Sequence, residues 1–353
     1  MSKGSPISVI VVLYLSEDVI ADCLGSLLSQ RRDIGRIVLV DNACPGGSVA
    51  TVRQEMQRHD LPIREVHDDA PPDARFAGVE LIRSDRNLGF AGGVNLGLTQ
   101  LMADPDVHYF WILNPDCELV PGCAEAMLRA AETAEQNSGF SLLGSRILYP
   151  GTQKIVQSDG GIYCRLTGRC RNIHQGATLA DADGDPSTGL DFISGASMLA
   201  SRAFIQRAGL MPEDYFLYYE EVAWAYARGN LPLVVCRDAI VLHHVGTAIG
   251  SGRRDRLPSP LSNYFHFRSR MRFMSRYHPF ALPISVGFSL LKIIQTALRG
   301  GWASAAAALR GMFGLPPPRS VCAALGGDRA MPLPWWRKEY HGPATAPRLL
   351  SDS

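Results

Sequence analysis

Patterns typical of buried strands and of helices alternate through the first third of this 353-residue chain. Continuous apolar runs predict strands covered on both faces at residues 7–13, 36–40, 79–82 and 109–113. Apolar residues at helical spacing predict helices at residues 18–30, 49–58 and 124–134. This alternation predicts an α/β fold with a largely parallel sheet, in which ligands bind at the carboxyl ends of the strands.

The middle of the chain has a less regular pattern, with short apolar pieces between Gly, Asp and Pro over residues 145–190. Hairpins and loops are therefore expected there. Strand-like runs follow at 192–199, 233–235 and 240–243, and a short helix is expected at 202–208. Acidic residues directly after the first apolar run favour a buried strand over a signal sequence.

Residues 281–299 are apolar apart from one polar stripe. The stripe consists of residues spaced to share one helical face: Ser285, Ser289, Lys292, Thr296 and Arg299. Such a helix is expected to lie on a membrane surface or to pack on the domain, rather than to span a bilayer. We divide the chain into a domain at 1–250, a basic helical extension at 251–315 and a Pro-rich, poorly ordered tail at 316–353.

Charge is distributed unevenly, although the net charge is only +1. Residues 250–320 contain eleven Lys and Arg residues and one acid, whereas the first 249 residues are net acidic. A basic block predicts an anionic partner: phosphate, nucleic acid or an acidic membrane surface. The arginines expected to make these contacts are Arg253, Arg254, Arg268, Arg270 and Arg272. The acidic domain, which has no recognisable nucleic-acid-binding module, argues against nucleic acid as the partner.

The eight cysteines form no C-x-x-C pair. Reduced thiols are therefore favoured over a zinc or redox motif, as is typical of a cytoplasmic protein.

Polar residues and glycines follow the predicted strands, at the edge where a ligand is expected. Asp41 could accept hydrogen bonds from a base or ribose, although a turn cap is the alternative. The glycine-rich run 87–97 would allow a phosphate to approach the backbone at the start of a helix, although a tight turn explains it equally well. Asp116 offers a carboxylate to Mg²⁺ or Mn²⁺, and a capping turn is again the alternative.

Two further groups lie later in the chain. Glu220 and Glu221 are adjacent in an aromatic setting that could raise one pKa for general-base catalysis, although exposed acids at a helix start are the alternative. His243 and His244 follow the last predicted strand, where one could complete a metal site or serve a structural role.

In their order along the chain, these segments resemble blocks of the family 2 inverting glycosyltransferases. The similarity is to the rhamnosyltransferase-like members that build bacterial surface polysaccharides, and it runs from about residue 6 to residue 275. The five blocks are DNAC at 41–44, NLGFAGGVNLG at 87–97, NPD at 114–116, GASML at 195–199 and FLYYEEVA at 216–223. The family's histidine after the last core strand matches His243 or His244.

This resemblance implies a GT-A fold, a Rossmann-like sheet flanked by helices, followed here by a C-terminal helical extension. It implies a nucleotide-sugar site lined by Tyr14, Asp41, Asn87, Gly89, Phe90, Gly92, Asn95, Asn114 and Asp116. It also implies Mg²⁺ or Mn²⁺ on Asp116, with His244 as a second ligand. Glu221 would be the catalytic base, with Glu220 beside it.

The activity implied is inverting, metal-dependent transfer of a sugar onto a glycan or lipid-linked saccharide. The donor that the resemblance favours is dTDP-rhamnose, which carries L-rhamnose. The protein is expected to act at the inner face of the cell membrane as a peripheral protein, with a homo-oligomer possible.

Three positions depart from the family pattern. Glu221 stands where the family has Asp, Ala223 stands where it has a second acid, and the end of the first strand, 12–15, lacks the family's Asn. These departures support an alternative, a glycosyltransferase-like protein that binds a nucleotide sugar or glycan without turnover. A sugar nucleotidyltransferase is disfavoured because no basic glycine-rich loop follows the first strand. A processive synthase is disfavoured because the sequence lacks a set of spanning segments.

Overall fold

The computed structural model describes residues 7–73, 76, 78–151, 154–184, 186–244, 257–325 and 335–336. Its strands are β1 (Ile7–Leu13), β2 (Ile34–Asn42), β3 (Ile63–His67), β4 (Val79–Ser84), β5 (Tyr109–Leu113), β6 (Cys117–Leu119), β7 (Leu142–Leu148), β8 (Val156–Ser158), β9 (Gly161–Tyr163), β10 (Cys170–Asn172), β11 (Ser197–Ser201) and β12 (Val234–His243). Its helices are α1 (Ile20–Leu28), α2 (Ser48–Arg58), α3 (Gly89–Met102), α4 (Cys123–Asn137), α5 (Arg202–Ala208), α6 (Glu220–Tyr226), α7 (Pro260–Tyr277), α8 (Leu282–Leu298), α9 (Trp302–Met312) and α10 (Arg319–Ala324). Short 3-10 turns occur at η1 (Glu213–Tyr215) and η2 (Pro279–Ala281).

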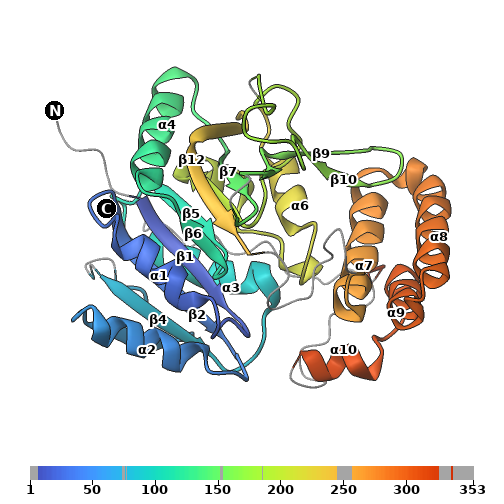
Figure 1. Cartoon of the computed structure of the whole chain (residues 1–353), viewed down its shortest axis with the longest axis horizontal. Coiled ribbons are helices and arrows are strands. Elements are labelled where there is room, and N and C mark those ends of the chain that lie inside the picture. The colour runs from blue at the N-terminus through green and yellow to red at the C-terminus, as the bar shows by residue number, and fades with distance from the viewer. Residues whose placement is uncertain are drawn as a thin grey trace, which may run out of the picture.

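A ten-stranded mixed sheet forms the centre of the molecule (Figure 1). Its strand order is β3-β4-β2-β1-β5-β11-β7-β12-β6, and β8 pairs with β7 off this path. The strands from β3 to β5 are parallel to one another, whereas β11 is antiparallel to both β5 and β7. The carboxyl ends of β1, β2 and β5 therefore meet at one edge of the sheet.

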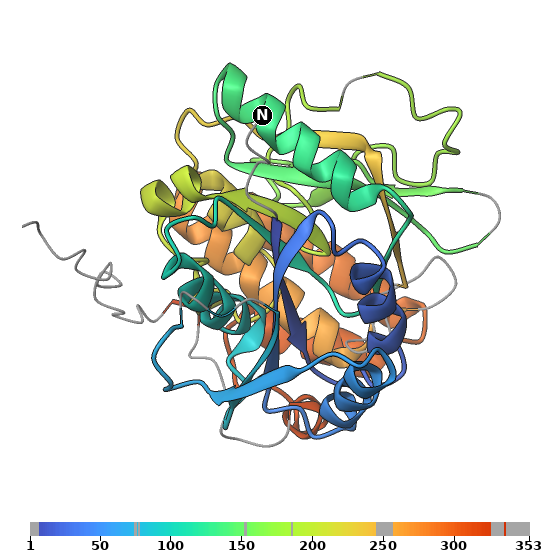
Figure 2. The same cartoon turned by 90° about the vertical axis from the view of Figure 1, so that its left-hand side faces the viewer.

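Helices cover both faces of this sheet (Figures 1 and 2). Alternate residues of β1 point to opposite faces: Val9 and Val11 pack with α1, α2 and α4, while Ile10 and Val12 pack with α3, α5 and α6. A strand covered on both faces must be apolar at every position, which is why β1 is a continuous apolar run. The predicted α/β architecture with C-terminal helices is confirmed.

Several predicted elements coincide with observed ones. The ranges 7–13, 109–113 and 202–208 match β1, β5 and α5. The two strands predicted at 233–235 and 240–243 are one strand, β12, because an irregularity between Cys236 and Ile240 lets it continue beside β7.

The glycine-rich run 87–97 is mostly helical, because α3 begins at Gly89 rather than after the run. Within this helix, a side chain at Gly93 would contact Val12, and a side chain at Gly97 would contact Ile10. Small residues at these positions let α3 lie close to β1. Two of the four glycines of the run therefore serve helix-to-sheet packing.

The C-terminal extension packs on the domain as helices α7 to α10 (Figure 1). A hydrophobic cluster joins α7 to α9 and α10, and it includes Val321 and Leu325. The prediction of a poorly ordered tail is therefore wrong for residues 316–325, which include α10. Apart from 335–336, the rest of the tail lies outside the described residues.

Three of the four arginines of α7 are buried inside the protein rather than presented to an acceptor or a membrane. Arg268 is fully buried, and Arg270 and Arg272 are 4% and 6% exposed. Arg268 donates hydrogen bonds to the backbone carbonyl groups of Asp214 and Tyr215. The prediction that these three arginines form an external anion site was wrong because their charges are satisfied within the chain.

Arg270 and Arg272 also make specific contacts inside the protein. Arg272 donates to the Asp214 carboxylate through Nη2 at 2.6 Å and Nε at 2.9 Å. Arg270 donates to the hydroxyl of Tyr219 and to Nε2 of His266. Burial and the Arg270 charge lower the pKa of His266 to about 3, so this imidazole is neutral and can accept. Arg253 and Arg254 lie outside the described residues.

Replacing Asp214 should destabilise the fold. Asp214→Ala would leave the Arg272 guanidinium buried without its counter-charge, and we expect the free energy of unfolding to fall by about 3 kcal/mol. The exposed pair of Arg53 with Glu65 provides the control, because Glu65→Ala should cost less than about 1 kcal/mol. Urea unfolding of both variants measures the difference, and equal losses would contradict the structural role given to Asp214.

Candidate active site

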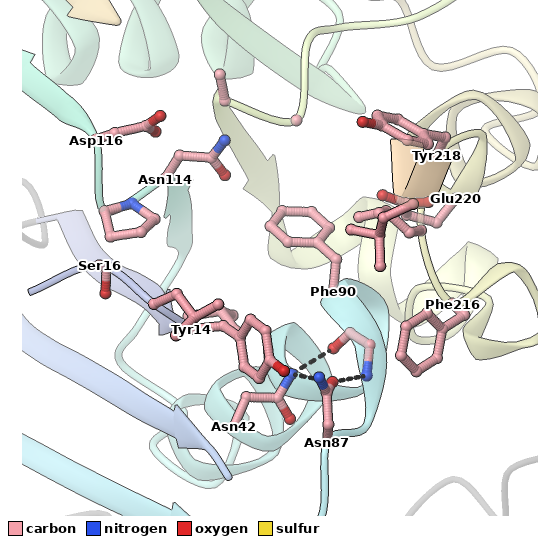
Figure 3. Close-up of a pocket in the computed structure, with 18 of the residues that line it drawn as sticks. Tyr14, Ser16, Asn42, Asn87, Phe90, Asn114, Asp116, Phe216, Tyr218 and Glu220 are labelled. Atoms are coloured by element: carbon pink, nitrogen blue, oxygen red, sulfur yellow. Dashed lines mark hydrogen bonds between the residues drawn. The ribbon is translucent and has the colours of Figure 1, made fainter. Parts of the chain in front are cut away.

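A cavity of about 310 Å³ lies at the carboxyl edge of the sheet, between the strand ends and the C-terminal helices (Figure 3). Its lining comes from the ends of β1, β2, β5 and β12, the start of α3, residues 194–196, the segment leading into α6, and the extension. The lining includes Tyr14, Asn87, Gly89, Phe90, Asn114, Asp116, Glu220 and Glu221, all expected from the sequence. Figure 3 shows Asp116 and Glu220 on opposite sides of this cavity.

The end of β2 and the start of α3 form one rigid wall. The Asn42 amide donates to Asn87 Oδ1 and to the Gly89 carbonyl, while its own Oδ1 accepts from the backbone N–H of Leu88. Gly89 has a φ of +73°, and a side chain there would collide with Phe216. Asn42 was not predicted, although it adjoins Asp41. Because side chains alternate along a strand, only one of the two neighbours can face the cavity.

Three residues expected in the nucleotide-sugar site do not line the cavity. Asp41 is buried beside it, where its carboxylate accepts from the Cys44 N–H and from Arg83. Asn95 is also buried and exchanges hydrogen bonds with the backbone of Met211. A side chain at Gly92 would collide with Leu88, so this glycine serves the packing of α3.

A carboxylate and an imidazole meet at one end of the cavity. Asp116 Oδ1 lies 3.2 Å from Nε2 of His243, and the Gln157 amide contacts Nδ1 of the same ring at 3.0 Å. Gln157 therefore fixes the orientation in which His243 faces Asp116. These two ligand atoms fit Mn²⁺ or Mg²⁺ and would leave further coordination positions for diphosphate oxygens.

Cys117 lies within ligand distance of this pair, with the three ligand atoms inside 4.8 Å of one another. Burial raises the pKa of its thiol well above the usual range, and the thiol donates to the carbonyl of Ala196. A protonated, buried thiol is a poor ligand for a hard cation. The chemistry of the site therefore depends on Asp116 and His243.

The histidine beside Asp116 is not the one assigned to the metal from the sequence. His244 turns away and contacts Glu118, with Nε2 2.6 Å from Oε1. Consecutive residues at the end of β12 project to opposite sides, so only His243 faces the cavity. The metal assignment is accordingly corrected from His244 to His243.

Two adjacent glutamates begin α6 at the other end of the cavity. Glu220 is 4% exposed, and its Oε2 has no hydrogen-bond partner among the described residues. Burial, reinforced by the neighbouring Glu221 charge, raises the pKa of Glu220 well above its usual range. Burial also raises the pKa of Glu221 to about 7, although backbone N–H groups oppose the shift. Near neutral pH, Glu221 is therefore the member of the pair that can exchange a proton with a ligand.

The segment before these acids has a strained backbone. Phe216, Tyr218 and Tyr219 all have left-handed φ values between 63° and 69°, which cost roughly 1 kcal/mol or more each for residues with side chains. Helix α7 supports this segment, because Ser269 donates to the Leu217 carbonyl and the Tyr218 hydroxyl contacts Ser262 at 2.9 Å. The position of Glu220 and Glu221 thus depends on α7.

The C-terminal extension also supplies an apolar part of the cavity wall. Leu261 of α7 and Ala324 and Leu325 around α10 line it. The Tyr14 hydroxyl donates to the Ala324 carbonyl at 2.9 Å, which joins the end of β1 to α10. The sequence did not indicate these residues, since small and apolar side chains in a Pro-rich tail carry no chemical signature.

Comparison with known proteins shows which proteins this chain resembles. Residues 8–141 match the family model described as glycosyl transferase family 2. The chain is similar to the low-salt glycan biosynthesis hexosyltransferase Agl10 of Haloferax volcanii, with 24% identity over 275 residues that cover 75% of this chain and 74% of the relative. It is also similar to the N-acetylglucosaminyl-diphospho-decaprenol L-rhamnosyltransferase of Mycobacterium tuberculosis, with 26% identity over 229 residues, 60% of this chain and 72% of the relative.

A solved structure agrees at the level of the fold. The crystal structure of GalNAc-T7 with UDP, GalNAc and Mn²⁺ superposes with a TM-score of 0.56 at 11% identity, covering 88% of this chain and 56% of that one. The GT-A fold expected from the resemblance is confirmed. The match to glycosyl transferase family 2 covers residues 8–141, and one of the relatives that the chain resembles is a rhamnosyltransferase.

The two histidines provide a matched test of the metal site. His243→Ala should weaken Mn²⁺ binding, measured calorimetrically with a nucleoside diphosphate present, by about tenfold or more, because a ligand is lost. His244→Ala should leave the affinity close to that of the parent protein, because this side chain contacts Glu118 instead. A loss confined to His244→Ala would return the assignment to that residue.

Proposed function

We propose that this protein transfers a sugar from a nucleoside-diphosphate sugar to an acceptor hydroxyl, with inversion at the anomeric carbon. The observation that carries the proposal is the placement of two different acidic groups at opposite ends of one cavity. The pair of Asp116 with His243 suits the diphosphate of a donor, and the pair of Glu220 with Glu221 suits proton transfer.

The donor would lie along the strand ends. Tyr14, Asn87, Gly89, Phe90 and Asn114 line this part of the cavity and would contact the nucleotide and sugar. Asp116 and His243 would hold a divalent cation, which when bound would stabilise negative charge on the leaving diphosphate. Gln157 would keep the imidazole of His243 aimed at that cation.

The acceptor would enter beside Glu221. Its hydroxyl proton would pass to the Glu221 carboxylate while its oxygen forms a bond to the anomeric carbon, from the face opposite the diphosphate. The bond from that carbon to the diphosphate oxygen breaks in the same step, which inverts the configuration. Glu220, protonated and buried, would orient Glu221 without competing for the proton.

The proposed donor is dTDP-L-rhamnose and the proposed acceptor is a glycan or lipid-linked saccharide. The similarity to a relative whose name specifies L-rhamnose transfer to a diphospho-decaprenol saccharide supports both choices. A lipid-linked acceptor in turn supports action at the cytoplasmic face of the cell membrane, with the protein bound peripherally.

A second candidate is a protein that binds a nucleotide sugar without turnover. The observation that favours it is Ala223, which is buried and leaves α6 without the family's further acid. Donor hydrolysis, or transfer to any acceptor, above the level of an inactive variant would exclude this candidate.

Removing the proposed base should separate transfer from binding. We expect Glu221→Gln to lower the transfer rate by about 10²-fold or more while nucleotide affinity stays near that of the parent. The parent rate should rise with pH through about 7, since the base must be deprotonated, and the variant should lose this dependence. Glu125→Gln on the exposed side of α4 is the control. Unchanged transfer by Glu221→Gln would contradict the role of Glu221.

Glu221→Gln should also change how the stability of the fold depends on pH. The folded-state pKa of Glu221 lies above its unfolded value, so its contribution to stability is fully present below the unfolded pKa and is lost as pH rises through about 7. Glu221→Gln removes this penalty. Its melting temperature relative to the parent should therefore be higher at pH 8 than at pH 5, as calorimetry would show.

A further inference from the structure

Helix α8 turns two polar residues inward together with apolar ones such as Ile293. Ser285 and Ser289, two members of the polar stripe recognised in the sequence, are fully buried. The Ser285 hydroxyl donates to the carbonyl of Thr167, and the Ser289 hydroxyl accepts from Arg270. This arrangement differs from that of a typical surface helix, whose polar residues face water and whose apolar residues face the protein.

The apolar side of α8 and the helix after it are correspondingly exposed. On α8 and its flanks, Phe280, Ile284, Leu291, Ile294 and Leu298 are between 52% and 99% exposed. On α9 the exposed apolar side chains are Trp302, Leu309 and Phe313. Both sets follow helical spacing, and only residues 299–301 separate the two helices in the chain. We call these eight residues the α8–α9 face.

The segment Pro279–Leu298 is long and apolar enough to span a bilayer, with a mean hydropathy of 1.5. Its polar contacts to Thr167 and Arg270, however, hold it along the side of the molecule (Figure 1). A helix fixed in this way can enter a bilayer only sideways, to the depth of its exposed side chains.

The charge around the face distinguishes between possible occupants. Residues 279–315 contain Lys292, Arg299 and Arg310 and no acidic residue. A second copy of the chain, related by two-fold symmetry, would bring these like charges against one another. An anionic lipid surface complements them, and Phe280 and Trp302 lie at opposite ends of α8, where aromatic rings suit the headgroup level.

We propose that the α8–α9 face docks this protein on an anionic lipid bilayer. The docking does not depend on sugar transfer, but it suits the proposed function. Helix α7 packs against α8 and α9 through Phe267 and Met271 and lines the cavity through Leu261. The bilayer would thus lie about one helix diameter, ~10 Å, from the cavity, within reach of a lipid-linked acceptor.

Vesicle flotation of the full chain tests the proposal. The parent should float with vesicles that contain phosphatidylglycerol, and binding should be weaker with phosphatidylcholine alone. The double variant Leu291→Glu with Leu298→Glu should lose about tenfold or more of the partition coefficient, because two apolar contacts are replaced by charges that lipid repels. Circular dichroism would confirm that this variant is folded.

The matched control places the same two charges on a distant helix. Thr133→Glu with Gln136→Glu lies on the exposed side of α4 (Figure 1) and should float as the parent does. Three results would overturn the proposal: no vesicle binding by the parent, unchanged binding by the α8 variant, or a dimer in sedimentation that the α8 variant dissociates. Equal binding to both kinds of vesicle would contradict the claim that the basic residues contribute to lipid binding.

Discussion

The hydrogen bonds from α7 to residues 214–219 hold the remaining structure of the site in place. Three residues of this segment have left-handed backbones, and their neighbours' carbonyl groups are satisfied by Arg268 and Ser269. Tightly packed support of this kind is what allows strained conformations to persist. Since Glu220 and Glu221 follow directly, a helix outside the family-matched segment determines where the acids lie.

This support also explains how a basic helix can lie behind an acidic site without neutralising it. The buried arginines of α7 are occupied by carbonyl groups, a tyrosine hydroxyl, a histidine and Asp214. The carboxyl groups of Glu220 and Glu221 keep raised pKa values because burial dominates their environment. Helices α8 and α9 pack on α7 through apolar residues and also expose large apolar side chains on their outer side.

The sequence was sufficient for the parts of the fold that local pattern determines. Continuous apolar runs located β1 and β5 because strands buried on both faces admit few polar residues. Block order located Asp116, Glu220 and Glu221. Tertiary contacts decide the rest. Because side chains alternate at a strand end, Asn42 rather than Asp41 lines the cavity, and His243 rather than His244 faces Asp116. Charge count alone could not reveal that Arg268 is buried, since composition does not identify partners.

The cavity between Asp116 and Glu221 is proposed as the donor site for a nucleoside-diphosphate sugar. Calorimetric titration of the intact protein with dTDP, UDP and GDP, each with and without Mn²⁺, is the decisive experiment. We expect Mn²⁺-dependent binding, strongest for dTDP if the donor is dTDP-rhamnose. Preference for UDP or GDP would keep the site and replace the donor. Absence of binding to all three nucleotides would contradict the claim.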